Sequence, residues 1–164
     1  MTDEILIAKD LSKSFGQLHV IQNLNITINK GDIYVLFGSN GAGKTTLVRL
    51  LSGLLHADSG DIQLFGMKPE DNKMKIKRRM GFMSHNPYLY DDLTALENLI
   101  FFGRLYSVEN EEEKALKMLK MVGLKHRAHD QVGPFSRGMK QRLALARCLL
   151  HDPDLIFLDE PYSG

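Results

Sequence analysis

Leucine and isoleucine alternate with polar residues over parts of the first thirty positions. Residues 5–8 form a short apolar run, and residues 20–28 end with an apolar side chain at every second position. Alternation with a period of two is typical of half-buried strands. We therefore expect two strands here, with a turn at residues 11–16 that exposes an aromatic side chain, and a small antiparallel sheet for the N-terminal part of the chain.

Later segments divide into apolar runs of strand length and stretches with helical periodicity. The expected strands are residues 33–37, 61–65, 80–83 and 155–158, and the expected helices are residues 47–55, 96–106, 109–122 and 137–150. Thr94 and Glu97 fit a capping box, and Ser136 stands where an N-cap belongs. Gly123 suits the position just past the end of a helix.

Composition restricts the class of protein. With 164 residues, 43% of them apolar and 25% charged, the chain has the size and make-up of a globular domain with a substantial core. A net charge of +1 gives no reason to expect a nucleic-acid partner, and the basic residues 68–79 are expected to form a solvated face. No apolar run approaches the ~18–20 residues of a membrane span, and the N-terminus does not resemble a signal peptide. The single cysteine, Cys148, is expected to be an inert packing residue.

The candidate chemistry begins with a glycine-rich stretch. Residues 38–45 match G-x-x-x-x-G-K-S/T, the phosphate-cradling loop of nucleoside triphosphatases, and they lie between an apolar run and a helical segment. Glycines let backbone N–H groups approach phosphate oxygens, and a helix N-terminus favours an anion. We expect Lys44 to reach the β- and γ-phosphates and Thr45 to offer its hydroxyl to Mg²⁺. An ordinary glycine-rich turn is the alternative.

Two carboxylates follow the last apolar run. Asp159 and Glu160 come directly after residues 155–158, and in a parallel sheet the C-terminal ends of the strands border the ligand crevice. Asp159 is placed to hold Mg²⁺, directly or through water, and Glu160 to polarise an attacking water. The alternative is a solvated strand end or a helix cap.

Four stretches, in this order, resemble the ATP-binding subunits of ABC transporters. They are residues 38–45 (Walker A), His85 at the Q-loop position, residues 135–142 (signature motif) and residues 155–160 (Walker B). The signature followed by Walker B is the specific part, because Walker A alone occurs in many nucleoside triphosphatases. The resemblance covers nearly the whole chain and is nearest to exporter-like subunits of bacteria or archaea.

This resemblance implies an α/β fold of the P-loop NTPase class. The expected architecture is a RecA-like core of the ABC ATPase type with an N-terminal antiparallel β-subdomain and an inserted α-helical subdomain. Residues 1–84 and 152–164 would form the core and β-subdomain, and residues 85–151 the helical subdomain with the signature helix.

The resemblance also implies roles for individual residues, with ATP and Mg²⁺ as cofactors. Glu160, Lys44 and His85 would be catalytic, and Thr45, Asp159 and His85 would hold the metal. The expected nucleotide-binding residues are Phe15, Ser39, Asn40, Gly41, Ala42, Gly43, Lys44, Thr45, Thr46, Ser136 and Gly138. Phe15 would stack on adenine; a buried core aromatic is the alternative.

Members of this family act in pairs and on membranes. The resemblance implies a second nucleotide-binding domain, identical or different, whose ATP would face Ser136 and Gly138 of this chain. It implies a transmembrane permease subunit on a separate chain, docked on residues 85–132. The protein would then be cytoplasmic, peripheral at the inner face of the cell membrane, and would use ATP hydrolysis to drive transport.

The chain departs from the family pattern at three places. His85 stands where glutamine is usual, and imidazole has a shorter reach and titrates near neutrality. Residues 135–139 read Phe-Ser-Arg-Gly-Met in place of Leu-Ser-Gly-Gly-Gln, and binding across the pair is expected to be retained. The chain ends before the family's switch histidine and its strand, so we expect a C-terminally truncated piece that lacks core strands and hydrolyses ATP weakly.

Other functions stay open at this stage. One is an ABC-class ATPase of DNA repair or translation, not coupled to transport, although the stretch between His85 and Ser136 has no room for a coiled-coil insertion. A GTPase would need an Asn-Lys-x-Asp motif, which the sequence lacks, and a kinase would not need the signature residues 136–142. A binding module without catalysis would be recognised by Mg-ATP affinity without turnover.

Overall fold

The chain forms two compact units, Met1–Lys77 and Arg78–Gly164. The computed structural model describes residues 3–84 and 86–159. The first unit contains β1 (Glu4–Phe15), β2 (Leu18–Asn29), α1 (Lys44–Leu51), β3 (Ser59–Leu64) and α2 (Pro69–Lys77). The second contains β4 (Met80–Met83), α3 (Ala95–Leu105), α4 (Glu111–Met121), the 3₁₀ turn η1 (Lys125–Arg127), α5 (Arg137–Leu149) and β5 (Leu155–Leu158). The expected subdomain boundaries within the ATPase stay a prediction.

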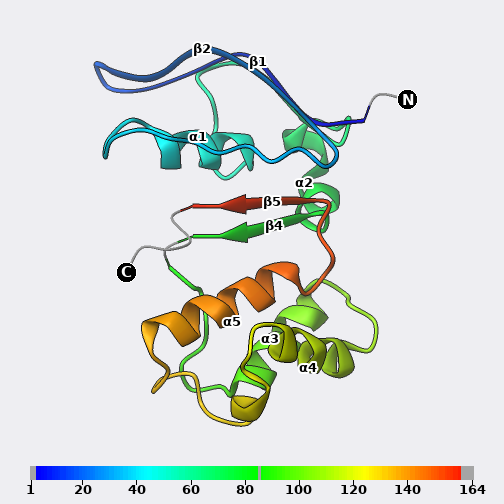
Figure 1. Cartoon of the computed structure of the whole chain (residues 1–164). Coiled ribbons are helices and arrows are strands. Elements are labelled where there is room, and N and C mark those ends of the chain that lie inside the picture. The colour runs from blue at the N-terminus through cyan, green and yellow to red at the C-terminus, as the bar shows by residue number, and fades with distance from the viewer. Residues whose placement is uncertain (1–2, 85, 160–164) are drawn as a thin grey trace. The chain divides into compact units, whose positions relative to one another are not determined.

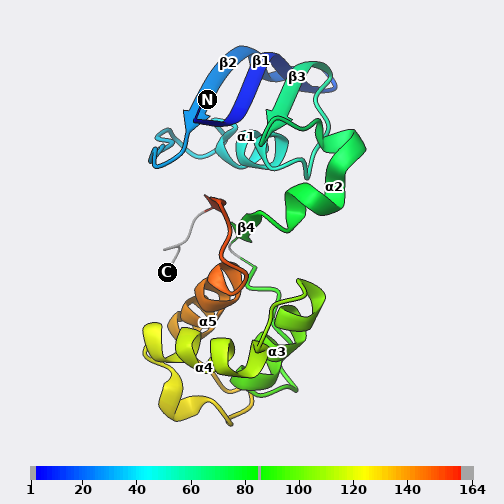
Figure 2. The same ribbon diagram turned by 90° about the vertical axis from the view of Figure 1, so that its right-hand side faces the viewer.

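The first unit is built on an antiparallel sheet with the order β2-β1-β3 (Figure 2). The prediction of an antiparallel sheet in the N-terminal part is confirmed, and its strand order comes from the structure. The predicted turn at residues 11–16 is wrong, because β1 continues to Phe15 and pairs with both neighbours. The chain reverses at Gly16 and Gln17 instead. A register shift between Ala8 and Leu11 explains the missed pattern, since it interrupts the alternation on which the strand prediction rests.

Helix α1 lies along one face of this sheet (Figures 1 and 2). Leu6, Leu11 and Leu64 of the sheet and Leu50 of the helix are fully buried. They form the apolar core that positions the start of α1. The basic segment that follows β3 has its lysines exposed, as expected, and folds locally into α2, which turns out of helical geometry at Asn72.

The predicted strand at residues 33–37 does not form. The segment pairs with no strand in the described part of the chain, and the side chains of Ile33 and Phe37 are each 90% exposed. Tyr34 donates a hydrogen bond to the carbonyl oxygen of Thr27 at 2.9 Å, which ties the segment to β2. Apolar, β-branched composition favours a strand, but a strand exists only where a neighbour accepts its backbone hydrogen bonds.

The second unit is layered. Strands β4 and β5 are parallel, with Met80 opposite Leu155 and Met83 opposite Leu158. Helix α5 lies between these strands and the pair α3 and α4 (Figure 1). Gly81 of β4 is required for the close approach, because an added Cβ would lie 2.6 Å from the sulfur of Cys148 on α5.

The predicted helix signals of the second unit are confirmed. Thr94 and Glu97 form the complete capping box of α3, and Ser136 caps α5. Gly123 follows α4 with φ of +71°. No helix in the described residues is both long and apolar enough to cross a bilayer.

Cys148 provides a test of this core. Its side chain is buried, and burial raises the pKa of the thiol to about 11. At pH 8 only about one thiol in a thousand is then ionised, so we expect an aromatic disulfide reagent to label the folded chain far more slowly than glutathione. Urea should restore full reactivity. Equal labelling rates with and without urea would contradict the buried position.

Candidate nucleotide-binding site

The glycine-rich loop closes around the side chain of its own lysine. Lys44 is the first residue of α1, and its Nζ donates hydrogen bonds to the carbonyl oxygens of Gly38 and Ser39, each at 2.8 Å. Gly41 and Gly43 have φ of +84° and +83°, a conformation that residues with a Cβ rarely adopt. Residues 38–42 are exposed. The ammonium group therefore stands inside an open backbone ring, as phosphate binding requires.

The first turn of α1 carries no acidic residue of its own. Gly43 occupies the N-cap position without a side-chain hydrogen bond. The N–H groups at a helix start and the positive end of the helix dipole favour an anion. Thr45 and Thr46 lie half-buried in this turn. The arrangement fits a polyphosphate, and the residues predicted from the motif are placed together here.

Sequence inspection missed the role of Val20 in shaping this loop. An added Cβ at Gly43 would lie 2.7 Å from Cγ1 of Val20 on β2, whereas one at Gly41 would meet nothing within 4 Å. The Val20 side chain therefore leaves no room for a Cβ at position 43 of the loop. No local pattern reports a contact between residues this far apart in the chain.

We expect Gly43→Ala to destabilise the chain more than Gly41→Ala. Both changes force a side chain into a positive φ, but only the first adds a clash, worth about 1–3 kcal/mol of unfolding free energy. Urea unfolding would measure the difference. Adding Val20→Ala to Gly43→Ala should bring its stability near that of Gly41→Ala. If the two single variants unfold at the same urea concentration, the contact does not shape the loop.

Phe15 lies at the end of β1 with 51% of its surface exposed. The alternative of a buried core aromatic is therefore excluded. The ammonium of Lys13 lies 5.5 Å from the ring centroid and is paired with Asp58. A hydrogen bond from Lys13 lowers the pKa of Asp58. Stacking of adenine on Phe15 stays a prediction, with one face of the ring already covered by a cation.

In the second unit the predicted acid borders the ends of two parallel strands. Asp159 follows β5, its backbone N–H donates to the carbonyl oxygen of Met83 at 2.8 Å, and its side chain is buried. Ser84, which precedes the Q-loop position, is also buried. The ends of β4 and β5 are thus side by side, as expected for the crevice edge of a parallel sheet. His85 and Glu160 themselves lie outside the described residues, so their roles stay predictions.

The signature motif also forms a helix start. Phe135 is buried as an anchor, and the Oγ of Ser136 accepts a hydrogen bond from the N–H of Met139 at 3.3 Å. The hydroxyl hydrogen remains able to donate. Gly138 is exposed with open space where a Cβ would stand, and the first turn of α5 has no acidic residue. This start fits an anion brought from outside the chain.

The geometry does not test the metal prediction. Within residues 3–84 and 86–159, no three His, Cys, Asp or Glu side chains gather as a metal site. Thr45 is in the first unit and Asp159 in the second. A hydroxyl and a carboxylate are each suitable Mg²⁺ ligands, and the metal roles of Thr45 and Asp159 stay predictions.

Comparison with known proteins identifies the family. A family model described as ABC transporter matches residues 21–163. This chain belongs to the ABC transporter family. It is 44% identical over 160 residues to the bacitracin transport ATP-binding protein BcrA of Bacillus licheniformis, covering 98% of this chain and 52% of that protein. It is 39% identical over 158 residues to the Nod factor export ATP-binding protein I of Burkholderia lata, covering 95% and 52%.

Solved structures agree with this assignment to the ABC transporter family. The ATP binding subunit of an ABC transporter matches with a TM-score of 0.88 and 29% identity, over 98% of this chain and 68% of that one. The predicted ABC ATPase fold is therefore confirmed. The chain spans about half the length of the first two curated relatives.

In this ABC ATPase chain, Arg147 holds the segment that follows β4, a role not predicted from sequence. Its Nη2 donates to the carbonyl oxygen of Phe82 at 3.2 Å, and the guanidinium lies over the rings of Phe102 and Tyr88, 5.0 and 5.9 Å from their centroids. The sequence signal that could have indicated this role is an arginine within an otherwise apolar helical stretch. It connects α5 and α3 to the residues around the Q-loop position.

Proposed function

We propose that this chain binds Mg-ATP and, as the ATP-hydrolysing subunit of an ABC transporter, powers transport. The observation that carries the proposal is the open ring of residues 38–45 around the Lys44 ammonium, at a helix start free of acidic residues. Such a site is complementary to a chain of phosphates rather than to a single carboxylate.

The residues divide the work as follows. Lys44 leaves the carbonyl oxygens of Gly38 and Ser39 to contact the β- and γ-phosphates. Thr45 and Asp159 would hold Mg²⁺, which would neutralise charge on the phosphate oxygens. Glu160 accepts a proton from the attacking water, and His85 orients that water. The remaining loop residues cradle the phosphates through their backbone: Ser39, Asn40, Gly41, Ala42, Gly43 and Thr46.

A second copy or a related domain completes the site. The start of α5, with the Ser136 hydroxyl and the open approach at Gly138, meets the γ-phosphate bound to the partner. Hydrolysis removes the phosphate that both domains contact, so it separates them. ATP-dependent association is the mechanical step that this geometry supports.

The membrane partner would bind the helical unit. The side chains of Tyr90 and Phe101 are 48% and 43% exposed, and their ring centroids lie 5.0 Å apart. Leu105, which is on α3 with Phe101, is 62% exposed. Exposed aromatic clusters of this kind mark protein interfaces. Another structural neighbour, cbiO1 from Clostridium perfringens, is described as part of the ABC transporter complex cbiONQ; it has a TM-score of 0.85 and 26% identity, over 99% of this chain and 67% of that one. With such a permease partner, this chain would lie in the cytoplasm at the inner face of the membrane.

Comparison of phosphate chain lengths tests the proposal. Calorimetric titration with Mg-ATP and with AMP should show ATP binding about 100-fold more tightly, because only ATP reaches Lys44 and the start of α1 with β- and γ-phosphates. Phosphate release measures hydrolysis in the same samples. Equal affinity for ATP and AMP would refute the assignment of the loop.

A further inference from the structure

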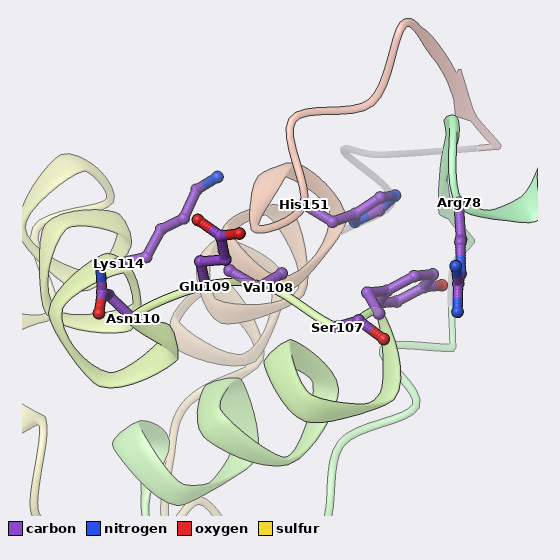
Figure 3. Close-up of a pocket in the computed structure, with 8 residues that line it drawn as sticks. Arg78, Ser107, Val108, Glu109, Asn110, Lys114 and His151 are labelled. Atoms are coloured by element: carbon purple, nitrogen blue, oxygen red, sulfur yellow. The ribbon is translucent and has the colours of Figure 1, made fainter.

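Charged side chains gather outside the residues assigned to the nucleotide. One group lines a pocket of about 500 Å³ in the second unit (Figure 3), and most of that lining lies within residues 85–132, the segment expected to dock the membrane partner. Another group lies in the first unit, at the end of β1, and consists of Lys13 and Asp58. This second group contacts Phe15, the residue predicted to stack on adenine, and has no assigned role.

Asp58 bonds to three successive residues that precede Phe15. Its backbone N–H donates to the carbonyl oxygen of Ser12 at 3.0 Å. Its Oδ1 accepts a hydrogen bond from Nζ of Lys13 at 2.6 Å, and its Oδ2 accepts one from the N–H of Ser14 at 2.7 Å. Bonds to a charged acceptor are stronger than those between neutral groups, so this one residue fixes the backbone on which the aromatic ring stands.

Strand β1 loses its neighbour β3 before it reaches Phe15. The pairing of these two strands extends to Ser12 and Ser59, whereas the pairing of β1 with β2 continues to Phe15. Beyond Ser12 the carboxylate of Asp58 takes the place of a neighbouring strand. A strand end without such support frays, so the side chain keeps the last residues of β1 in order.

The ammonium of Lys13 is held on one face of the Phe15 ring. It lies 5.5 Å from the ring centroid, and only 15% of the lysine side chain is exposed. Fixing a lysine costs rotamer freedom, which the ion pair with Asp58 offsets. The ring is 51% exposed, so a planar group such as a nucleotide base can stack on the face that the cation leaves open.

The hairpin that carries Phe15 contacts the phosphate loop. Val20 of β2 lies so close to Gly43 that an added Cβ at Gly43 would be 2.7 Å from Cγ1 of Val20. Asp58 lies in the connection between β3 and α1, the helix that begins at the loop. Its carboxylate therefore joins the segment behind the phosphate site to the segment that carries the ring.

We propose that Asp58 is a positioning residue for the nucleotide base, because it fixes Phe15 through Lys13 and the N–H of Ser14 with one face of the ring left open. Asp58 itself does not contact the base. The inference rests on the proposed function, since the base reaches Phe15 only when phosphates occupy residues 38–45.

Tripolyphosphate is the probe that tests this role, because it has phosphates for the loop and no base. Calorimetric titration of the whole chain with Mg-ATP and with Mg-tripolyphosphate gives a ratio of affinities that reports the contribution of the base. Asp58→Ala should lower this ratio about tenfold and leave tripolyphosphate affinity within a factor of about two. Lys13→Met should lower it about threefold, because the bond from Ser14 remains.

A double-variant cycle shows whether Asp58 acts through the ring. Phe15→Ala should lower the ratio at least as far as Asp58→Ala, and adding Asp58→Ala to it should lower the ratio no further. Asp61→Ala is the matched control. Asp61 is an exposed acid of β3 that pairs with Lys68 at 3.7 Å, so its loss changes the net charge equally and should leave the ratio unaltered.

Four results would overturn the inference. They are an unchanged ratio in Asp58→Ala, an equal loss of affinity for both ligands, an equal fall of the ratio in Asp61→Ala, and a further fall when Asp58→Ala is added to Phe15→Ala. If Asp58→Ala fails to fold, Asp58→Asn decides. It keeps an acceptor for the N–H of Ser14 and removes the charge that faces Lys13, so it should lower the ratio about threefold, and an unchanged ratio would again overturn the inference.

Failure of the proposed function gives a different result. If the unaltered chain binds no tripolyphosphate, the assignment of residues 38–45 to phosphate is refuted, and the inference on Asp58 is refuted with it. If the unaltered chain binds tripolyphosphate and only the response of the ratio to Asp58→Ala is missing, the phosphate site stands and the inference on Asp58 alone is overturned.

Discussion

Lys44→Ala is expected to lower the affinity for Mg-ATP by about 100-fold, or ~3 kcal/mol. The ammonium is the only charged side chain of the loop at residues 38–45, and a hydrogen bond to a charged phosphate is worth about 1.5–3 kcal/mol. The same group donates hydrogen bonds to the carbonyl oxygens of Gly38 and Ser39. Calorimetric titration measures the change in affinity, and thermal unfolding reports whether losing these bonds loosens the loop.

Lys30→Ala is the matched control for this change. Lys30 is an exposed lysine of the same unit, outside the loop, so its removal alters the net charge equally and should leave Mg-ATP affinity within a factor of about two. If both variants lose affinity equally, the effect is one of general charge. If Lys44→Ala binds Mg-ATP normally, the loop is not the phosphate site.

Asn98→Leu is expected to destabilise the chain by about 3 kcal/mol. Asn98 is fully buried on α3, and its side chain accepts from the N–H of Tyr90 and donates to the carbonyl oxygens of Tyr90 and Thr94, at 2.9, 2.9 and 3.0 Å. Leucine has a similar volume but loses all three hydrogen bonds, each worth about 1 kcal/mol, and leaves the N–H of Tyr90 without this acceptor. The carbonyl oxygens of Tyr90 and Thr94 keep the bonds that they accept from the N–H groups of Leu93 and Asn98. Urea unfolding followed by circular dichroism would measure the loss.

Arg104→Leu serves as the comparison on the same helix. Arg104 is exposed and makes a surface ion pair with Glu111, so this change should cost no more than about 1 kcal/mol. Both variants place a leucine on α3, so the difference between their free energies of unfolding isolates the loss of the buried amide. A loss below about 1 kcal/mol for Asn98→Leu would mean that residues 90–94 find other partners.

Local signals in the sequence predicted local structure well. The capping box at Thr94 and Glu97, the cap at Ser136 and the glycine after α4 were each recognised and are each present. A cap joins residues within one turn of a helix, so nearby residues are sufficient to specify it. The same holds for the glycine loop, whose bonds from Lys44 connect residues five and six positions apart.

Predictions that depended on distant neighbours were less reliable. Residues 33–37 have strand composition but no strand partner in the described residues, and residues 11–16 were read as a turn although β2 and β3 both pair with that part of β1. Three contacts were not predicted. Val20 leaves no room for a Cβ at Gly43, the Arg147 guanidinium stacks on the ring of Tyr88, and the Asn98 side chain accepts a hydrogen bond from the N–H of Tyr90. Each depends on a contact with a residue that the local pattern does not specify.

The sequence by itself determined the family, the order of its motifs and the starts of the two helices that we propose to face phosphate, because these depend on residue types at short, regular spacing. The tertiary structure alone decided which apolar runs became strands, how closely β2 approaches the loop, and that Asp58 bonds to three successive residues before Phe15. Backbone pairing and side-chain packing join residues far apart in the chain, and their geometry is set only when the chain has folded.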